Sequence, residues 1–309
     1  MDSYLGGDRE QATISPWGPD DEIGRLNMMS AERSAEVMSR IDPASVFDLA
    51  VTYRMGMPYW PVAGDPKYDI YMTHTPQGSV NEDLSGSGRE AHERFSYAGS
   101  AIAMYSHTGT HLCSLSHIGF AGKFWNGWNA EEDLGSRSWN VGGVVPPITA
   151  RGVLLDVAAL HGLDCLDNSH AITAEELERC CERQGVELRE GDVVLVRTGR
   201  MSRFEDPKAF IETPPGLGME AAVALCERYG AMCVGLDCGG EVLPPEEEDT
   251  FLPVHAYLLS KAGAPVFENL WLEDLAAAEQ WEFAFLAAPL KLAGSTGMPV
   301  RPLAYALRD

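Results

Sequence analysis

Short apolar runs alternate with capped helical segments in the second half of this chain of 309 residues, and this alternation limits the fold more than any other feature. Residues 152–157 and 192–197 are rich in valine and leucine, as is typical of buried strands. Thr173 to Glu176 form a capping-box pattern that opens a helix, and Gly185 suits its end. Another helix is expected at 219–229, followed by strands at 232–236, 264–267 and 283–286. Strands that alternate with helices predict an α/β fold.

The N-terminal part of the chain has a different pattern. Turn residues precede one short helical stretch at 31–40, which Ser30 can cap. We expect residues 1–43 to form an extension that packs on one domain of residues 44–309. A stretch rich in glycine and charge at 78–93 predicts a long loop, which in compact domains is typical of a lid.

The composition excludes several classes of partner. The chain has 23 basic and 46 acidic residues, a formal net charge of −23, which argues against nucleic acid and favours a bound dication. No apolar run approaches the roughly 20 residues that span a bilayer, and the first residues do not resemble a secretory signal. The seven cysteines contain no CxxC pair, so neither a disulfide framework nor a zinc ribbon is indicated. We therefore expect a cytoplasmic protein that binds neither nucleic acid nor membrane.

One segment is unusually rich in potential metal ligands. Three of the eight histidines and a cysteine fall within eleven residues: His107, His111, Cys113 and His117. On a regular strand His107 and His111 would lie roughly 13 Å apart, whereas each ligand of a zinc ion has to bring its nitrogen within roughly 2.1 Å of it. Residues 108–110 are poor helix formers. We therefore predict a tight loop bent at Gly109, in which the two rings converge on a metal. A coincidental cluster on a polar loop is the alternative.

The same segment resembles the HxGTHxDxxxH signature of the cyclase family of metal-dependent hydrolases, which includes bacterial kynurenine formamidase and isatin hydrolase. The resemblance covers about residues 46–301, and residues 17–22 resemble a longer subgroup that has an N-terminal extension. It implies a single α/β domain of the swivelling β/β/α type, with a mixed sheet and flanking helices. Further stretches resemble the family's motifs in the expected order: 48–50, 57–61, 191–199, His255 with 266–270, and 289–301.

The resemblance also implies roles for individual residues. His107 and His111 would bind a first metal ion, and His117 would be a second-site ligand or the catalytic base. His255 and Glu268 would close the metal site, and Glu268 would bind metal or share the proton transfer. Three aromatic side chains are expected to bind the substrate, with ordinary core packing as the alternative for each: Trp60, Phe124 and Trp125.

Cys113 departs from the family pattern, which has aspartate at this position. A thiolate binds zinc at roughly 2.3 Å, and its softness favours zinc over manganese or magnesium. In a second interpretation Cys113 has left the metal shell, and in a third it is a nucleophile beside a histidine. We expect one or two zinc ions per chain, with manganese as the alternative metal.

These observations predict an enzyme that hydrolyses a small amide, cyclic amide or lactone with an aromatic or conjugated body. Metal-activated water would attack the carbonyl, and His117 would accept its proton. The alternatives are a dehydratase, isomerase or cyclase of the same fold, or a metal-free protein that uses Cys113 or only binds a ligand. The resemblance further implies a homodimer or homotetramer in which loops near the site meet a neighbouring subunit.

Overall fold

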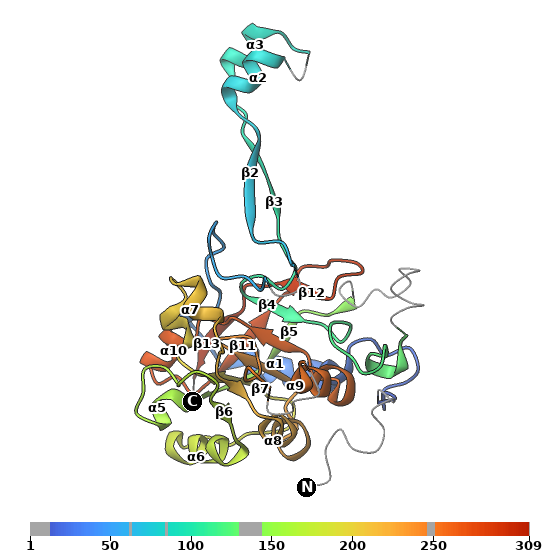
Figure 1. Ribbon diagram of the computed structural model, residues 1–309, viewed down its shortest axis with the longest axis vertical. Coiled ribbons are helices and arrows are strands. Elements are labelled where there is room, and N and C mark those ends of the chain that lie inside the picture. The colour runs from blue at the N-terminus through green and yellow to red at the C-terminus, as the bar shows by residue number, and fades with distance from the viewer. Residues whose placement is uncertain (1–12, 62–63, 84–85, 130–143, 246–250, 309) are drawn as a thin grey trace.

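A mixed sheet forms the centre of the body in this computed structural model, which describes residues 13–61, 64–83, 86–129, 144–245 and 251–308 (Figure 1). Its four middle strands are parallel, and the strands on both sides of them pair antiparallel. Within the described residues the nine strands follow this order: β1 (Ile41–Asp48), β13 (Leu303–Leu307), β11 (Glu282–Ala287), β5 (Ile148–Asp156), β7 (Val193–Arg197), β9 (Cys233–Leu236), β10 (Val266–Glu268), β4 (His111–Cys113) and β12 (Gly297–Pro299).

Both faces of the parallel strands are buried. In β7, Val194 and Val196 join the core beneath one helical layer, whereas Val193 and Leu195 join the core on the opposite face. This division follows from the two-residue period of a strand. The first layer contains α5 (Val157–Leu160), α6 (Ala174–Gln184), α8 (Met219–Val223) with the π-helical η5 (Ala224–Arg228), and α9 (Pro253–Ala256) with the π-helical η6 (Tyr257–Ala262).

The opposite face is covered by η1 (Gly24–Met28), α1 (Ala31–Ser39) and α10 (Glu273–Ala277). Smaller elements complete the body: η2 (Trp125–Gly127), η4 (Arg200–Arg203), α7 (Pro207–Ile211) and the pair β6 (Ala171–Ile172) with β8 (Gly216–Leu217). The expected α/β fold with a mixed sheet and flanking helices is confirmed. The capping box at Thr173 and the left-handed end at Gly185 are also present.

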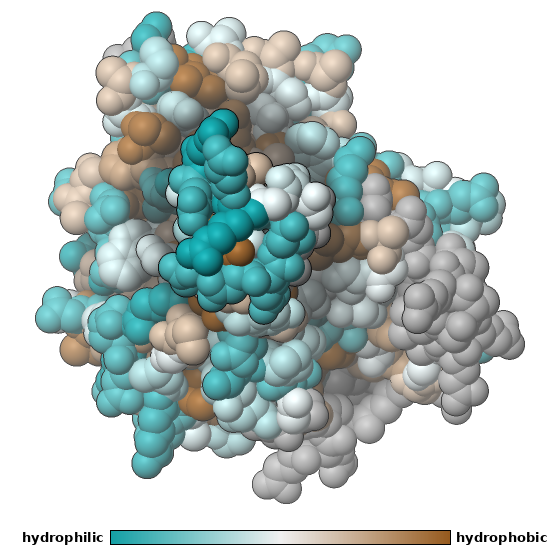
Figure 2. Space-filling view, turned by 90° about the horizontal axis from the view of Figure 1, so that it is seen from above, coloured by the Kyte–Doolittle hydropathy of each residue, from teal (hydrophilic) through white to brown (hydrophobic). Residues whose placement is uncertain are grey.

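A long arm projects from the body beside the sheet (Figure 1). Its shaft is a hairpin of β2 (Asp69–His74) and β3 (Gly99–Ala103), and its tip carries α2 (Pro76–Glu82) and α3 (Arg89–Arg94). The prediction of a long loop at 78–93 was therefore wrong. The tip is mainly hydrophilic (Figure 2), but the arm also exposes six large apolar side chains: Ile70, Tyr71, Met72, Phe95, Tyr97 and Ile102.

The N-terminal segment contacts the body through the buried Leu26 and through polar groups. Asp21 Oδ2 accepts hydrogen bonds from Ser15 Oγ at 2.6 Å and from the indole N–H of Trp125 at 2.8 Å. The Arg25 guanidinium donates to three backbone carbonyls of the body. The division into 1–43 and 44–309 stays a prediction, and β1 crosses that boundary. In the described part of the chain, no helix combines the length and the apolarity that crossing a bilayer requires.

Candidate metal centre

The turn before β4 brings His107 and His111 together. Gly109 has φ +64°, and a Cβ at this position would lie 2.8 Å from the Tyr53 ring, so a larger residue would be both strained and crowded. The ring centroids of His107 and His111 lie 4.9 Å apart. The predicted tight loop bent at Gly109 is confirmed.

The sheet brings a distant carboxylate to the same place. β4 lies between β10 and β12, and its residue His111 pairs with Glu268 across the antiparallel ladder. The imidazole Nε2 of His111 lies 2.9 Å from Glu268 Oε2. Because neighbouring residues of a ladder place their side chains close together, the sheet register joins two groups that are 157 positions apart (268 − 111).

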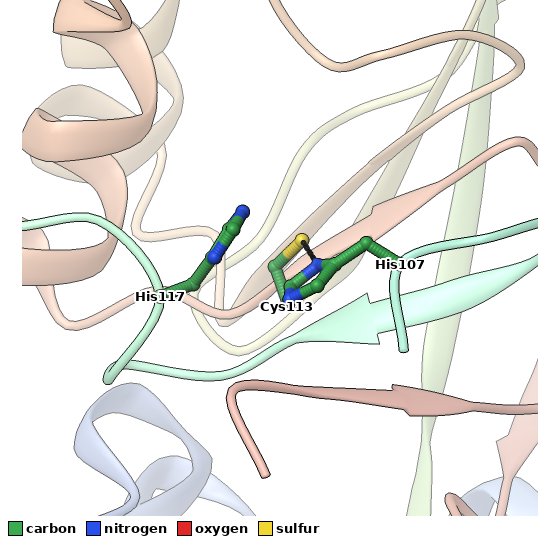
Figure 3. Close-up of side chains that lie close together, drawn as sticks. All are labelled: His107, Cys113 and His117. Carbon is green, nitrogen blue, oxygen red and sulfur yellow. Dashed lines mark hydrogen bonds between the residues drawn. The ribbon is translucent and has the colours of Figure 1, made fainter. Parts of the chain in front are cut away.

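Cys113 lies at the centre of the cluster. Its Sγ is 3.2 Å from His107 Nδ1, 3.3 Å from His111 Nε2 and 3.6 Å from Glu268 Oε2. Figure 3 shows Cys113 with His107 and His117. The His117 ring stacks on that of His107 with centroids 3.7 Å apart. The thiol therefore occupies the position that a shared metal ligand would require.

His255 completes the cluster from the helical layer. Its Nε2 donates to Glu268 Oε1 at 2.8 Å, and its Nδ1 donates to Glu241 Oε2 at 2.5 Å. The backbone N–H of His255 also donates to this Glu241 oxygen, at 2.9 Å. All five residues that were expected to converge therefore do so, together with Cys113: His107, His111, His117, His255 and Glu268.

Three of the imidazoles have their outer nitrogen held by the protein. His111 Nδ1 donates to the Gly109 carbonyl at 2.9 Å, and His255 Nδ1 donates to Glu241. His107 Nε2 lies 3.0 Å from Thr296 Oγ1. Metal-binding histidines typically hold their second nitrogen in this way, which directs the other nitrogen at the ion.

The donor atoms form two overlapping groups, each with its atoms within 4.8 Å of one another. One contains His111, Cys113 and Glu268, and the other contains His107, Cys113 and His117. Nitrogen, thiolate sulfur and carboxylate oxygen are the donors that zinc prefers. The residues therefore fit one zinc ion, or two that share the Cys113 sulfur.

Burial and neighbouring charges together set the charge states of the cluster. It lowers the pKa of His117 to about 3, helped by the nearby charge on His255, so the His117 imidazole is neutral. Burial would raise the pKa of Glu268, but His255 and His111 hold it well below its usual value. Burial would lower the pKa of His255, but Glu268 and Glu241 raise it well above the ordinary range. A carboxylate and a neutral imidazole are thus available as ligands.

A cavity of about 240 Å³ opens beside the cluster. His107, His117, His255 and Glu268 form part of its wall, whereas Cys113 and His111 are not among the described residues that line it. Most of the remaining wall is apolar or aromatic, and it includes Tyr59, Trp60, Tyr105, Phe204, Phe210 and Phe251.

The aromatic residues expected at the substrate site divide into two groups. Trp60 lines the cavity, as expected. Phe124 and Trp125 are buried away from it, and the part of the chain that the structure describes gives them no place in its wall. The Trp125 indole N–H donates to Asp21, so this side chain holds the N-terminal segment in place.

Two positioning residues were missed by sequence reasoning, Glu241 and Thr296. Glu241 follows β9 after a pair of glycines, and its position near a strand end was its only signal. Thr296 lies within the stretch 289–301 that resembles a family motif, but nothing in the sequence indicated a role for this residue. Asp237, which follows β9, accepts hydrogen bonds from Thr198 and Gly199 and holds the turn after β7.

The chain is similar to known proteins in sequence and in fold. A family model described as "Putative cyclase" matches residues 47–240, which include the histidine segment but end before His255. The similar solved structures include a protein described as a novel cyclase. It has 24% sequence identity and a TM-score of 0.80, and the match covers 96% of this chain and 100% of that one. Isatin hydrolase A from Ralstonia solanacearum has 20% identity, a TM-score of 0.63, and coverage of 85% and 92%. A predicted metal-dependent hydrolase from Bacillus stearothermophilus has 23% identity, a TM-score of 0.53, and coverage of 84% and 98%. At these identities the structures show a shared fold. No curated protein matched in sequence.

Proposed function

Because the chain belongs to the cyclase family, we propose that it is a metal-dependent hydrolase of a small amide, cyclic amide or lactone with an aromatic or conjugated body. The observation that carries this proposal is the convergence of three histidines, Cys113 and Glu268 around one point beside an apolar cavity. The similarity to isatin hydrolase A and to a metal-dependent hydrolase supports the reaction class. The aromatic wall, with Trp60 and Tyr105, suits a flat substrate.

Zinc is the proposed metal, with manganese as the alternative. His111, Cys113 and Glu268 would hold one ion, and a second ion would be held by His107 and Cys113, which leaves His117 for the proton transfer. When bound, the ion lowers the pKa of water toward neutrality and polarises the scissile carbonyl. Cys113 is proposed as a ligand because its sulfur lies among the donor atoms and is not in the described wall of the cavity.

The proton transfer is assigned to the side chains that face the cavity. A ring nitrogen of His117 is neutral and accepts the proton of the attacking water, then returns it to the leaving nitrogen or oxygen. Glu268 is the alternative proton acceptor, because its carboxylate also lines the cavity. Glu241 keeps the His255 ring oriented, and the apolar wall excludes bulk water.

Metal content and turnover measured on one preparation test this proposal. Protein purified without added metal should contain zinc, and it should hydrolyse members of a panel of formylated anilines, cyclic imides and aryl lactones. Removal of the ion with a chelator should abolish turnover, and zinc should restore it. His74→Gln, which removes an imidazole on the arm, serves as the control. Full turnover of metal-free protein in excess chelator would rule the proposal out and favour chemistry by Cys113.

We further propose that a second copy of this chain packs on the shaft of the arm, giving a homodimer or a homotetramer. An isolated two-stranded hairpin is marginally stable in water, and this one exposes Ile70, Tyr71, Met72 and Ile102. Exposed apolar side chains that lie close together are typical of an interface. The shaft begins near Asp65 and ends near Tyr105, both of which line the cavity, so the interface would border the active site.

Sedimentation measurements test the assembly. Wild-type protein should sediment as a dimer or tetramer, and Tyr71→Glu with Ile102→Glu should shift it toward the monomer without unfolding the body. Ile14→Glu is a matched control, because Ile14 is exposed but lies outside the arm. A monomeric wild type would contradict this assignment.

A further inference from the structure

A second group of metal-ligand residues lies outside the candidate centre. His161 follows the end of α5, His170 precedes β6, and Glu176 lies in the first turn of α6. These elements lie at the end of the body opposite the arm (Figure 1). One nitrogen from each ring and one carboxylate oxygen lie within 4.8 Å of one another.

The three side chains point at a common position. His161 Nε2 is 2.5 Å from Glu176 Oε1, and His170 Nε2 is 2.8 Å from the same oxygen. The two rings are edge to face, with centroids 5.2 Å apart. Ligands of a tetrahedral zinc ion are separated by roughly 3.4 Å, since each lies about 2.0–2.1 Å from the metal. A small outward rotation of each ring would therefore give metal-ligand spacing.

The carboxylate is already held in place. Glu176 Oε2 accepts hydrogen bonds from the Thr173 backbone N–H at 2.8 Å and from Thr173 Oγ1 at 3.0 Å. The side chain is largely buried, which leaves Oε1 directed at the two imidazoles. Hydrogen bonds of this kind orient a metal-binding carboxylate. The imidazole side chains are 30% and 27% exposed, so water can reach the remaining coordination position.

We propose that His161, His170 and Glu176 form a second metal site that takes a divalent transition ion, zinc above all. Two imidazoles and a carboxylate, with a water molecule in the fourth position, form an established zinc donor set. The ion would fasten the end of α5 and the start of α6 to the segment that leads into β6. Its effect would therefore be to stabilise this layer.

The layer is connected to the candidate centre through the backbone. The His170 carbonyl accepts from the Gly216 N–H at 3.1 Å, and Leu217 in the same strand forms a bridge with Glu241. Glu241 in turn orients His255. An ion at the second site would thus stabilise the strand pair that lies next to this positioning carboxylate.

Zinc binding to three versions of the full chain tests the proposal. In equilibrium dialysis, the double variant with His161→Gln and His170→Gln should bind one equivalent fewer than the wild type. His74→Gln, which removes a half-buried histidine on β2, should bind as the wild type does. Glu176 is left unchanged, so the capping box and the helix it begins are preserved. Equal zinc binding by the wild type and the double variant would overturn the proposal and leave the cluster a set of hydrogen bonds.

Cobalt separates the two sites. A cobalt ion bound to the Cys113 thiolate should show a near-ultraviolet sulfur-to-metal absorption band, which a site of nitrogen and oxygen donors does not have. The double variant should lose part of the visible cobalt absorption and keep the sulfur band. If the double variant does not fold, His161→Gln alone should weaken zinc binding at this site by about tenfold or more. Visible absorption that is unchanged in the folded variants would contradict the assignment.

Discussion

The candidate centre and the second group of ligands, His161, His170 and Glu176, use similar donor atoms but hold them differently. We call this second group the peripheral cluster. In the centre, the outer nitrogens of His107, His111 and His255 all have protein partners. In the peripheral cluster, the protein holds the carboxylate of Glu176, and the two imidazole rings are partly exposed. Ligands held in advance lose less freedom when they bind an ion. We therefore expect zinc to bind more tightly at the centre than at the peripheral cluster, because the protein already holds the imidazole rings of the centre in place.

The largest effect should come from His111→Ala. This ring is fully buried, and its loss removes one donor and leaves Glu268 Oε2 without its imidazole partner. We expect loss of the bound ion and a fall in kcat/KM of about a thousandfold or more, since metal activation is worth several kcal/mol. Metal analysis and steady-state kinetics measure both. Turnover near the wild-type value would show that the centre does not need this ligand.

The next largest effect should come from Cys113. Cys113→Ala should weaken zinc binding by roughly a hundredfold, because a charged donor is removed from the middle of the cluster. Cys113→Asp should keep the site and shift its preference toward manganese, since carboxylate oxygen is the harder donor. Competition between the two metals measures this shift. Zinc binding that is unchanged in Cys113→Ala would remove the ligand assignment.

A smaller effect is expected from Glu241→Gln. Glu241 contacts His255 and not the proposed ion. Its loss should lower metal affinity or activity by about 10–100-fold, which is typical when a hydrogen-bond partner of a metal ligand is mutated. Glu220→Gln, at an exposed carboxylate in α8, is the matched control and should behave as the wild type. If both variants behave alike, then holding the outer nitrogen of a histidine is not what distinguishes the centre.

The smallest effect should come from Thr173→Ala. The substitution removes an N-cap, so the free energy of unfolding should fall by about 1 kcal/mol. It also removes one of the two hydrogen bonds that hold the Glu176 carboxylate, so zinc binding at the peripheral cluster should weaken while the centre is unchanged. Ser30→Ala removes the cap of α1 and should lower stability without affecting zinc. Equal zinc binding in both variants would mean that the held carboxylate contributes nothing.

Local sequence predicted the parts of the fold and site that local geometry decides. The turn at Gly109, the cap of α1 and the capping box of α6 depend on residues within a few positions of one another. His255 and Glu268 were found only because their motif resembles that of a family. Nothing in their spacing from His107 predicts that they meet it.

The errors have physical causes of the same kind. Thr296 and Glu241 act through hydrogen bonds that exist only after distant strands have paired, so no local pattern marks them. Trp125 lies close to His117 in sequence, but its indole bonds Asp21 and the ring is buried away from the cavity. Glycine and charge at 78–93 indicated a loop, whereas Thr75 and Gly88 begin two short helices there.

The position of β4 has a consequence for how the protein folds during its synthesis. β4 pairs only with β10 and β12 among the described strands, so the histidine segment has no sheet partner until residues 266–299 have left the ribosome. Non-local pairing of this kind delays folding and leaves unpaired strand edges exposed. Through most of translation the nascent chain would therefore carry its histidines and Cys113 unpaired, and the centre would become competent for metal only when synthesis is nearly complete.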